Sequence, residues 1–254
     1  MSQDDETARR LEFLWRDDER PRSGPGPKPG LSTERIVRAA IEIADGEGLD
    51  GVSMQRVAKR LDVTAMSLYR YVPSKDDLVD AMMDTASGEP PDLAGLPGWR
   101  DRVEGWVKGL WARYQAHPWM LRVRLGNPIG PNQLAWFEAL LHSISDIGLS
   151  HDEMISVNLF VSGATQGLAK ISVDTAPGPA DAGGMTYDQA LTKVVDAERF
   201  PTLSALLAAG TFTAPERVPE PTDAYVVPNL EFGLRQMLAG IEDYVAERRR
   251  NRGE

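Results

Sequence analysis

The segment from residue 33 to residue 78 constrains the fold most, because it predicts short helices joined by tight turns. Ser32 and Thr33 are good N-cap residues for the first helix. The apolar residues that follow recur at i, i+4, i+7 and i+8, the spacing of a helix with one buried face. They are Ile36, Ala40, Ile43 and Ala44. Gly46 and Gly48 end this helix.

A tight turn separates the second and third helices of the segment. Ser53 caps the second helix, and residues 62–64 form the turn. The third helix, residues 65–72, stops at Pro73, because the residue before a proline is pushed out of the helical region. Ser74 then caps a fourth helix that joins the two parts of the chain. This layout is a helix-turn-helix in a three-helix unit, whose second motif helix enters the major groove of DNA.

The third helix also has suitable chemistry for contacting DNA. It is too short to be stable alone in water, so Leu68 and Val72 must pack beneath it. Its other face carries hydroxyls, aromatic rings and a guanidinium that can contact phosphates or base edges. From these residues alone, the face is either a DNA reader or the polar side of an ordinary bundle helix.

A family resemblance favours the first reading. Residues 51–78 closely resemble the N-terminal domain of the tetracycline-repressor (TetR) family of transcriptional regulators, through an ordered set of residues. This set is Ser53, Ala58, Val63, Leu68, Tyr69, Tyr71, Lys75 and Leu78. More weakly, residues 117–119 and 232–234 are similar to the C-terminal domain of the tetracycline-repressor branch.

The resemblance implies which residues contact DNA. They are Gln55, Ala65, Met66, Ser67, Tyr69, Arg70, Tyr71 and Lys75. We assign Tyr69 and Lys75 to the phosphate backbone, which the helix N-terminus beside Lys75 also attracts. We assign Gln55, Ser67 and Arg70 to base reading, and Ala65 and Met66 to apolar contact. Tyr71 either contacts DNA or packs against the first helix.

Charge is unevenly distributed along the chain. The formal net charge is −10, which argues against a protein that coats nucleic acid by bulk electrostatics. Residues 20–80 hold nearly equal numbers of basic and acidic residues, so the excess acid lies elsewhere. Because a few phosphate contacts give only weak binding, such a module requires a second copy, and we expect a homodimer on double-stranded operator DNA.

Residues 1–30 are predicted to be a flexible N-terminal extension. The stretch 20–30 is rich in proline and glycine and is either a basic arm along DNA or a solvated linker. Before it, residues 8–16 form two helical turns with Leu11, Leu14 and Trp15 on one side, either docked or loose. No apolar run has the length of a signal peptide or a membrane span, and there is no cysteine. We therefore expect a cytoplasmic protein without membrane contact.

The remainder of the chain predicts helices only. Helical spacing recurs over residues 99–114, 134–147, 151–173, 187–197, 202–209 and 229–249. The expected fold is therefore all-α, with a helix-turn-helix DNA-binding domain at 31–80 and a larger helical ligand-binding and dimerisation domain at 81–254.

Two of these helices are candidates for the dimer interface. The last helix carries a wide apolar face, and the helix from His151 carries Phe160 beside the small residues Gly163 and Gly167. A pair of helices from each subunit predicts a four-helix, two-fold interface, as the resemblance also implies. The alternative is that both faces pack inside their own chain.

A ligand site is predicted in the same domain. Aromatic walls with a few polar groups are how small apolar molecules are held. The candidate ligand-binding residues are Trp106, Trp111, Arg124, Asn158, Ser162 and Gln166. The alternative is that the tryptophans are core residues and the polar stripe meets water or the partner subunit.

The ligand is not expected to be a tetracycline–magnesium complex, and no metal or cofactor is predicted. Arg124 stands where that branch of the family has a metal-coordinating histidine, and a guanidinium has no lone pair to give. The histidines lack metal-binding spacing, and no nucleophile elbow or phosphate-binding loop is present, so we do not expect an enzyme.

The sequence thus predicts a sequence-specific DNA-binding regulator, a repressor that a small hydrophobic ligand releases from its operator. The alternative is a DNA-binding dimer without an effector, whose C-terminal domain binds a protein partner.

Overall fold

The computed structural model describes residues 3–16, 30–123, 130–175, 187–212 and 228–252, and every regular element in these ranges is helical. The predicted all-α class is therefore confirmed. The chain divides into two compact units, one of Met1–Lys170 with Val226–Glu254 and the other of Ile171–Tyr225. Within the described ranges, no helix is both long and apolar enough to cross a membrane.

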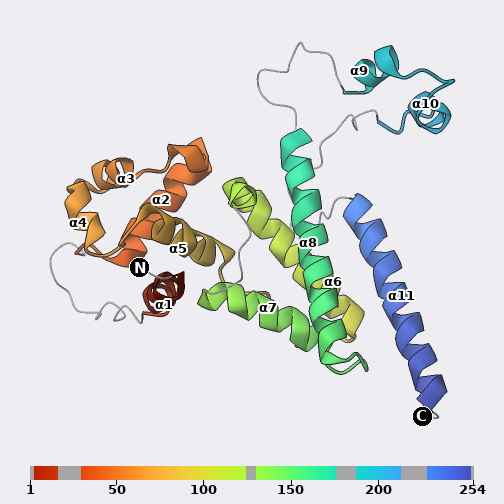
Figure 1. The fold of residues 1–254 in the computed structure, drawn as a ribbon, viewed down its shortest axis with the longest axis horizontal. Helices are drawn as coiled ribbons and strands as arrows, with labels where there is room; N and C mark the ends of the chain where they lie inside the picture. Colours follow the sequence, from red (N-terminus) through yellow and green to blue (C-terminus); the bar gives the residue numbers. More distant parts are fainter. Residues whose placement is uncertain (1–2, 17–29, 124–129, 176–186, 213–227, 253–254) are drawn as a thin grey trace. The chain divides into compact units, whose positions relative to one another are not determined.

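Four helices of the first unit form the predicted helix-turn-helix region (Figure 1). They are α2 (Thr33–Glu47), α3 (Met54–Leu61), α4 (Ala65–Tyr69) and α5 (Lys75–Ser87), with a 3₁₀ turn η1 (Leu49–Gly51) after α2. A serine or threonine caps each helix by accepting a hydrogen bond from the backbone N–H three residues on. The caps are Ser32, Ser53, Thr64 and Ser74.

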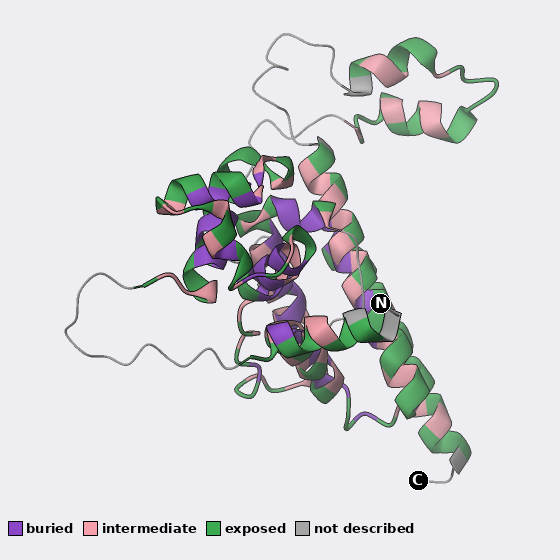
Figure 2. Cartoon of the chain, turned by 60° about the vertical axis from the view of Figure 1, so that its left-hand side comes forward, coloured by how far each residue is buried: buried purple, intermediate pink, exposed green. Residues whose placement is uncertain are grey.

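The larger helices of this unit follow α5. They are α6 (Trp99–Ala116), α7 (Pro131–Ser143), α8 (His151–Thr175), which belongs to this unit up to Lys170, and α11 (Pro228–Arg252), with a 3₁₀ turn η2 (Pro118–Arg122) after α6. Buried residues of the helix-turn-helix region and of the larger helices lie in the interior of the unit. Helix α11, at the C-terminus, is mainly exposed or half-buried (Figure 2).

The helix expected over residues 134–147 both begins and ends earlier than predicted, because α7 spans Pro131–Ser143. Ile144 and Ile147 are buried in the following turn, so their helical spacing reflects packing and not a continued helix. Gly148 adopts a φ of 102°, a conformation that glycine tolerates well and that lets the chain reverse toward α8.

Within residues 1–30, the structure describes a helix, α1 (Gln3–Leu14), that packs on α5. Phe13 is its buried anchor, while Leu11 and Trp15 are exposed, so the expected apolar side was wrongly assigned. Arg10 Nε donates to Asp80 Oδ2 at 2.8 Å, which adds an ion pair to this contact.

The second unit contains two short helices, α9 (Tyr187–Val194) and α10 (Pro201–Ala208), which contact each other. Helix α9 ends earlier than the helix predicted over residues 187–197, whereas α10 lies one residue earlier than the helix predicted over residues 202–209. The structure describes no buried residue in either helix, and the apolar Val194 and Leu206 are exposed.

Candidate nucleic-acid interface

The turn of the helix-turn-helix is built by local hydrogen bonds. Asp62 follows α3 in the left-handed conformation, with φ 56° and ψ 46°, which aspartate tolerates better than most residues. Its neighbour Val63 donates its backbone N–H to Ala58 O at 3.0 Å and so closes the end of α3. Thr64 Oγ1 then accepts from Ser67 N at 3.3 Å and starts α4. The turn predicted at residues 62–64 is therefore confirmed.

Helix α4, the predicted reader helix, is held by packing and is shorter than predicted. Leu68 and Val72 are fully buried beneath it, as expected. Helical structure ends at Tyr69 instead of Val72, because Tyr71 N and Val72 N both donate to Leu68 O at 2.9 Å and tighten the chain ahead of Pro73.

The eight predicted DNA-contacting residues lie at the surface of this region. Met66 is 76 % exposed and Tyr69 is 44 % exposed. Gln55, Arg70 and Lys75 are exposed, and Ala65, Ser67 and Tyr71 are half-buried.

Ser67 has a structural role besides its predicted DNA contact. Its Oγ lies 2.9 Å from Thr64 Oγ1, within the N-terminal cap of α4. A hydroxyl has one donor and two acceptor sites, so this bond leaves further capacity for a base or phosphate.

Ion pairs leave specific cations available on this surface. Arg56 and Arg60 of α3 are bound by Glu47 and Glu42 of α2, respectively. Among the described residues, no carboxylate forms an ion pair with Arg70 or Lys75. These two side chains can therefore offer their charge to phosphate or to a base edge.

Helix α5 connects this surface to the larger helices through a buried carboxylate. Asp84, near the end of α5, is 6 % exposed, and its Oδ1 accepts from Gln133 N at 3.0 Å. Asn132 Nδ2 donates to both Asp84 Oδ2 and Asp84 O at 3.1 Å. The carboxylate thus caps the N-terminus of α7, where negative charge is stabilising. Burial raises the pKa of Asp84, while the hydrogen bonds from Gln133 and Asn132 act in the opposite direction.

This contact leaves no room at Gly130. A Cβ on Gly130 would lie 2.1 Å from Asp84 Oδ1, which no real side chain permits. The sequence contains one indication that α7 is capped by a distant side chain. Gly130-Pro131 opens a helix without an N-cap side chain, so the capping oxygen must come from elsewhere in the fold.

A second carboxylate joins α2 to the residues after α6. Asp45 Oδ1 lies 2.8 Å from His117 Nδ1 and accepts from Trp119 Nε1 at 2.7 Å. His117 and Trp119 belong to the segment 117–119, whose similarity to the C-terminal domain of the tetracycline-repressor branch was noted from the sequence. Asp45 was not predicted to have a role. The helix-turn-helix region is thus tied to the larger helices at two places, through α2 and through α5.

The predicted ligand-binding residues are only partly brought together. Trp106 is buried, donates its Nε1 to Trp136 O at 2.8 Å and meets the Trp136 ring edge-on, with centroids 5.5 Å apart. Asn158 is also buried, and its Nδ2 donates to Phe137 O at 3.1 Å. Both residues therefore contact neighbouring positions of α7.

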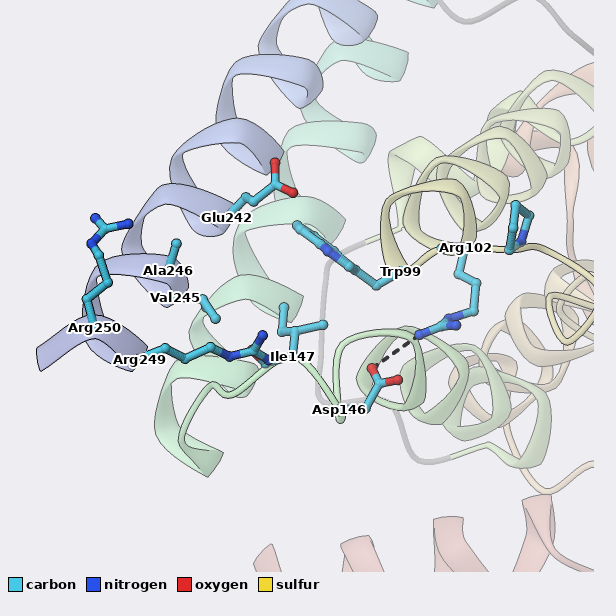
Figure 3. A pocket seen from close by; sticks show the side chains of 11 residues that line it. Trp99, Arg102, Asp146, Ile147, Glu242, Val245, Ala246, Arg249 and Arg250 are labelled. Carbon is cyan, nitrogen blue, oxygen red and sulfur yellow. Dashed lines mark hydrogen bonds and ion pairs between the residues drawn. The ribbon is translucent and has the colours of Figure 1, made fainter. Parts of the chain in front are cut away.

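The other candidates occupy varied positions. Ser162 Oγ donates to Asn158 Oδ1 at 3.4 Å, Gln166 is half-buried, and Trp111 is buried. Arg124 lies outside the described residues. None of the six lines the cavity shown in Figure 3, which lies between α6, the α7–α8 turn and α11.

A helix-turn-helix with an exposed second helix, two cations beside it that no described carboxylate pairs, and a connection to a larger helical region define the class of protein as a helix-turn-helix DNA-binding regulator. Comparison with known families agrees. A model described as "Bacterial regulatory proteins, tetR family" matches residues 36–82, and one described as "Tetracyclin repressor-like, C-terminal domain" matches residues 90–245. The chain belongs to the TetR family.

Individual relatives are similar over most of the chain. The HTH-type transcriptional repressor DrrR1 of Streptomyces coeruleorubidus is 38 % identical over 253 residues, which cover 95 % of this chain and 88 % of DrrR1. Apo ActR from Streptomyces coelicolor has a TM-score of 0.70 at 26 % identity and covers 87 % of this chain and 99 % of its own. ActR in complex with actinorhodin has a TM-score of 0.68 at 25 % identity, with coverages of 84 % and 96 %.

Proposed function

We propose that this protein is a homodimeric transcriptional repressor that leaves its operator when a small hydrophobic ligand binds its larger domain. The observation that carries the proposal is the exposed α4 surface, with Tyr69, Arg70 and Lys75 presented from a capped and tightly packed helix-turn-helix. DrrR1 is named as a repressor, and ActR is known bound to actinorhodin, which supports both halves of the proposal. We place the DNA-binding domain at 31–80 and the ligand-binding and dimerisation domain at 81–254, with action on DNA in the cytoplasm and no catalytic step.

The DNA contacts follow from the exposed groups. Arg70 and Gln55 reach base edges, while Tyr69 and Lys75 bind the phosphate backbone and fix the register. Met66 offers an apolar contact to a thymine methyl group. Two such surfaces related by a two-fold axis read a pseudo-palindromic operator in successive major grooves.

The dimer interface is supported by apolar residues that the described part of the chain leaves uncovered. Leu159 and Phe160 of α8 are 62 % and 63 % exposed, next to the exposed glycines Gly163 and Gly167. On α11, the predicted apolar face is largely used inside the chain, since Leu230, Leu234 and Leu238 are buried there. Phe232 is exposed instead. A second copy of α8 and α11 covers these surfaces in a four-helix interface.

The ligand acts by changing the separation of the two reader helices. Its proposed site involves the Trp106, Trp111 and Asn158 region, which contacts α7 through Trp136 and Phe137. A movement of α7 reaches α5 through Asp84, and α5 begins directly after the reader helix. A ligand that prefers the displaced arrangement lowers operator affinity by its differential binding.

The test is fluorescence anisotropy of the purified protein with DNA from upstream of its own gene, against scrambled DNA and across salt concentrations. We expect tight, salt-dependent binding that prefers the upstream DNA. Tyr69→Ala should weaken this binding while leaving the dimer intact, and Arg199→Ala, an exposed charge in the second unit, should leave it unchanged. Wild-type affinity in Tyr69→Ala would show that α4 is not the reader.

A further inference from the structure

A cavity of about 660 Å³ lies between the N-terminal end of α6, the turn after α7 and the last turns of α11. This volume is within the range of small-molecule sites, roughly 300–1,000 Å³. Figure 3 shows the side chain of Trp99 pointing from α6 toward α11, with Arg249 reaching from α11 toward Ile147. The cavity shares no residue with the proposed effector site around Trp106.

The lining combines one aromatic wall with an aliphatic floor. Trp99 is the aromatic residue, and Ile147, Val245 and Ala246 supply apolar surface. Gly148 lies beside this floor, because a Cβ on it would be at an ordinary van der Waals distance of 3.5 Å from Val245 Cγ1. A flat aromatic ring has both a stacking partner and an apolar surface here.

Among the described residues, no carboxylate forms an ion pair with two arginines of the lining, Arg249 and Arg250. Glu242 is paired with Arg100, and Asp146 Oδ1 accepts from Arg102 Nη2 at 3.2 Å. Arg249 instead donates its Nη2 to the carbonyl oxygen of Ile147 at 3.2 Å. A carbonyl holds the guanidinium in place without neutralising it, and no described carboxylate forms an ion pair with Arg249. Its remaining donors are available to an anionic group.

We propose that this cavity is a second small-molecule site, which binds a planar aromatic compound carrying a carboxylate or sulfonate. The ring lies against Trp99 and the aliphatic floor. The anionic group accepts hydrogen bonds from the guanidinium of Arg249. Neutral aromatic compounds bind here more weakly because they lack the charge-assisted contact.

The test compares two fluorescent probes on the full-length protein without DNA. Anilinonaphthalene sulfonate carries the required anionic group, and phenylnaphthylamine has the same ring system without it. Arg249→Gln should lower the affinity for the sulfonate about tenfold and leave the neutral probe unchanged. Arg235→Gln is the matched control, since it removes the same charge from an exposed position of α11 that does not line the cavity. It should change either affinity less than about twofold.

Trp99→Leu tests the aromatic wall independently and should lower the affinity for both probes about fivefold. Circular dichroism of each variant confirms that the helices are retained. Equal effects of Arg249→Gln and Arg235→Gln, or unchanged binding in both Arg249→Gln and Trp99→Leu, overturn the proposal. The probe experiment contains no operator DNA, so a negative result in it would not contradict the proposed repressor function. Equally, the operator-binding result for Tyr69→Ala does not affect the interpretation of the probe experiment.

Discussion

The contact between Asp84 and the start of α7 predicts a measurable coupling between two residues far apart in sequence. Asp84→Ala removes the oxygens that accept from Gln133 N and Asn132 Nδ2, so the first turn of α7 loses its cap. We expect this change to lower the free energy of unfolding by about 2 kcal/mol, since caps contribute about 0.5–2 kcal/mol and hydrogen bonds to charged groups about 1.5–3 kcal/mol. The cost of burying the carboxylate, which also raises its pKa, offsets part of the larger figure.

Gly130→Ala perturbs the same contact from the other side. Its Cβ would lie 2.1 Å from Oδ1 and 2.5 Å from Cγ of Asp84, so one of the two segments must shift. Overpacking of this kind costs about 1–3 kcal/mol. Asp84→Ala removes both of these atoms, and the nearest remaining atom of residue 84 is Cβ at 2.9 Å. The free energy of unfolding of the double variant Asp84→Ala/Gly130→Ala should therefore decrease by at least about 1 kcal/mol less than the sum of the decreases in the two single variants.

The assay is urea unfolding followed by tryptophan fluorescence at a fixed protein concentration, because dimerisation makes apparent stability concentration-dependent. Gly95→Ala is the matched control, since nothing lies within 4 Å of its added Cβ and its stability should change little. Additive losses in the Asp84 and Gly130 variants would refute the argument that the carboxylate packs against Gly130. A loss in Gly95→Ala equal to that in Gly130→Ala would refute the steric explanation.

The pH dependence of stability gives a second readout of Asp84. Burial raises the pKa of Asp84 in the folded chain above its usual value of 3.8. The folded state then binds this proton more readily than the unfolded state, so stability from this group falls as pH rises from 3.8 through the raised pKa. Asp84→Asn should flatten the dependence in that window. An unchanged slope would show that Asp84 titrates normally.

Three further predictions concern the links between helices and between subunits. Leu159→Glu places a charge on the exposed face of α8 and should convert the dimer to monomers in analytical ultracentrifugation; an unchanged dimer would place the interface elsewhere. The pKa of Glu153 is lowered to about 2, and the hydrogen bond from Tyr244 is the largest cause. The contribution of Glu153 to stability is therefore present above pH 4.5 and is lost as the pH falls toward 2. Tyr244→Phe should raise this pKa in a carbon-13 NMR titration, and no rise would contradict the assignment. Asp45→Ala should cost about 1–2 kcal/mol in urea unfolding by leaving Trp119 Nε1 without an acceptor, whereas Asp45→Asn keeps an oxygen and should cost less.

Sequence reasoning succeeded where the determining interactions are local. The caps at Ser53 and Ser74 and the turn at Asp62 use hydrogen bonds that span a few residues, so the residue types alone indicate them. The same reasoning gave the helical class and the buried Leu68. It misplaced the end of α7, since Ile144 and Ile147 are buried by tertiary packing in a turn.

The tertiary structure alone decided how the reader helix is connected to the rest of the chain. Asp84 and Asp45 look like ordinary surface carboxylates in sequence, because their partners Gln133 and Trp119 lie 49 and 74 residues away. The tertiary structure also shows that the apolar face of α11 is mostly covered within the chain. The sequence could not predict this, because an apolar stripe on a helix does not indicate which surface packs against it. Sequence thus determined the helical elements of the helix-turn-helix region, whose causes are local, and it predicted a reader surface on them. Packing determined the connections, whose causes are contacts that exist only once the chain has folded.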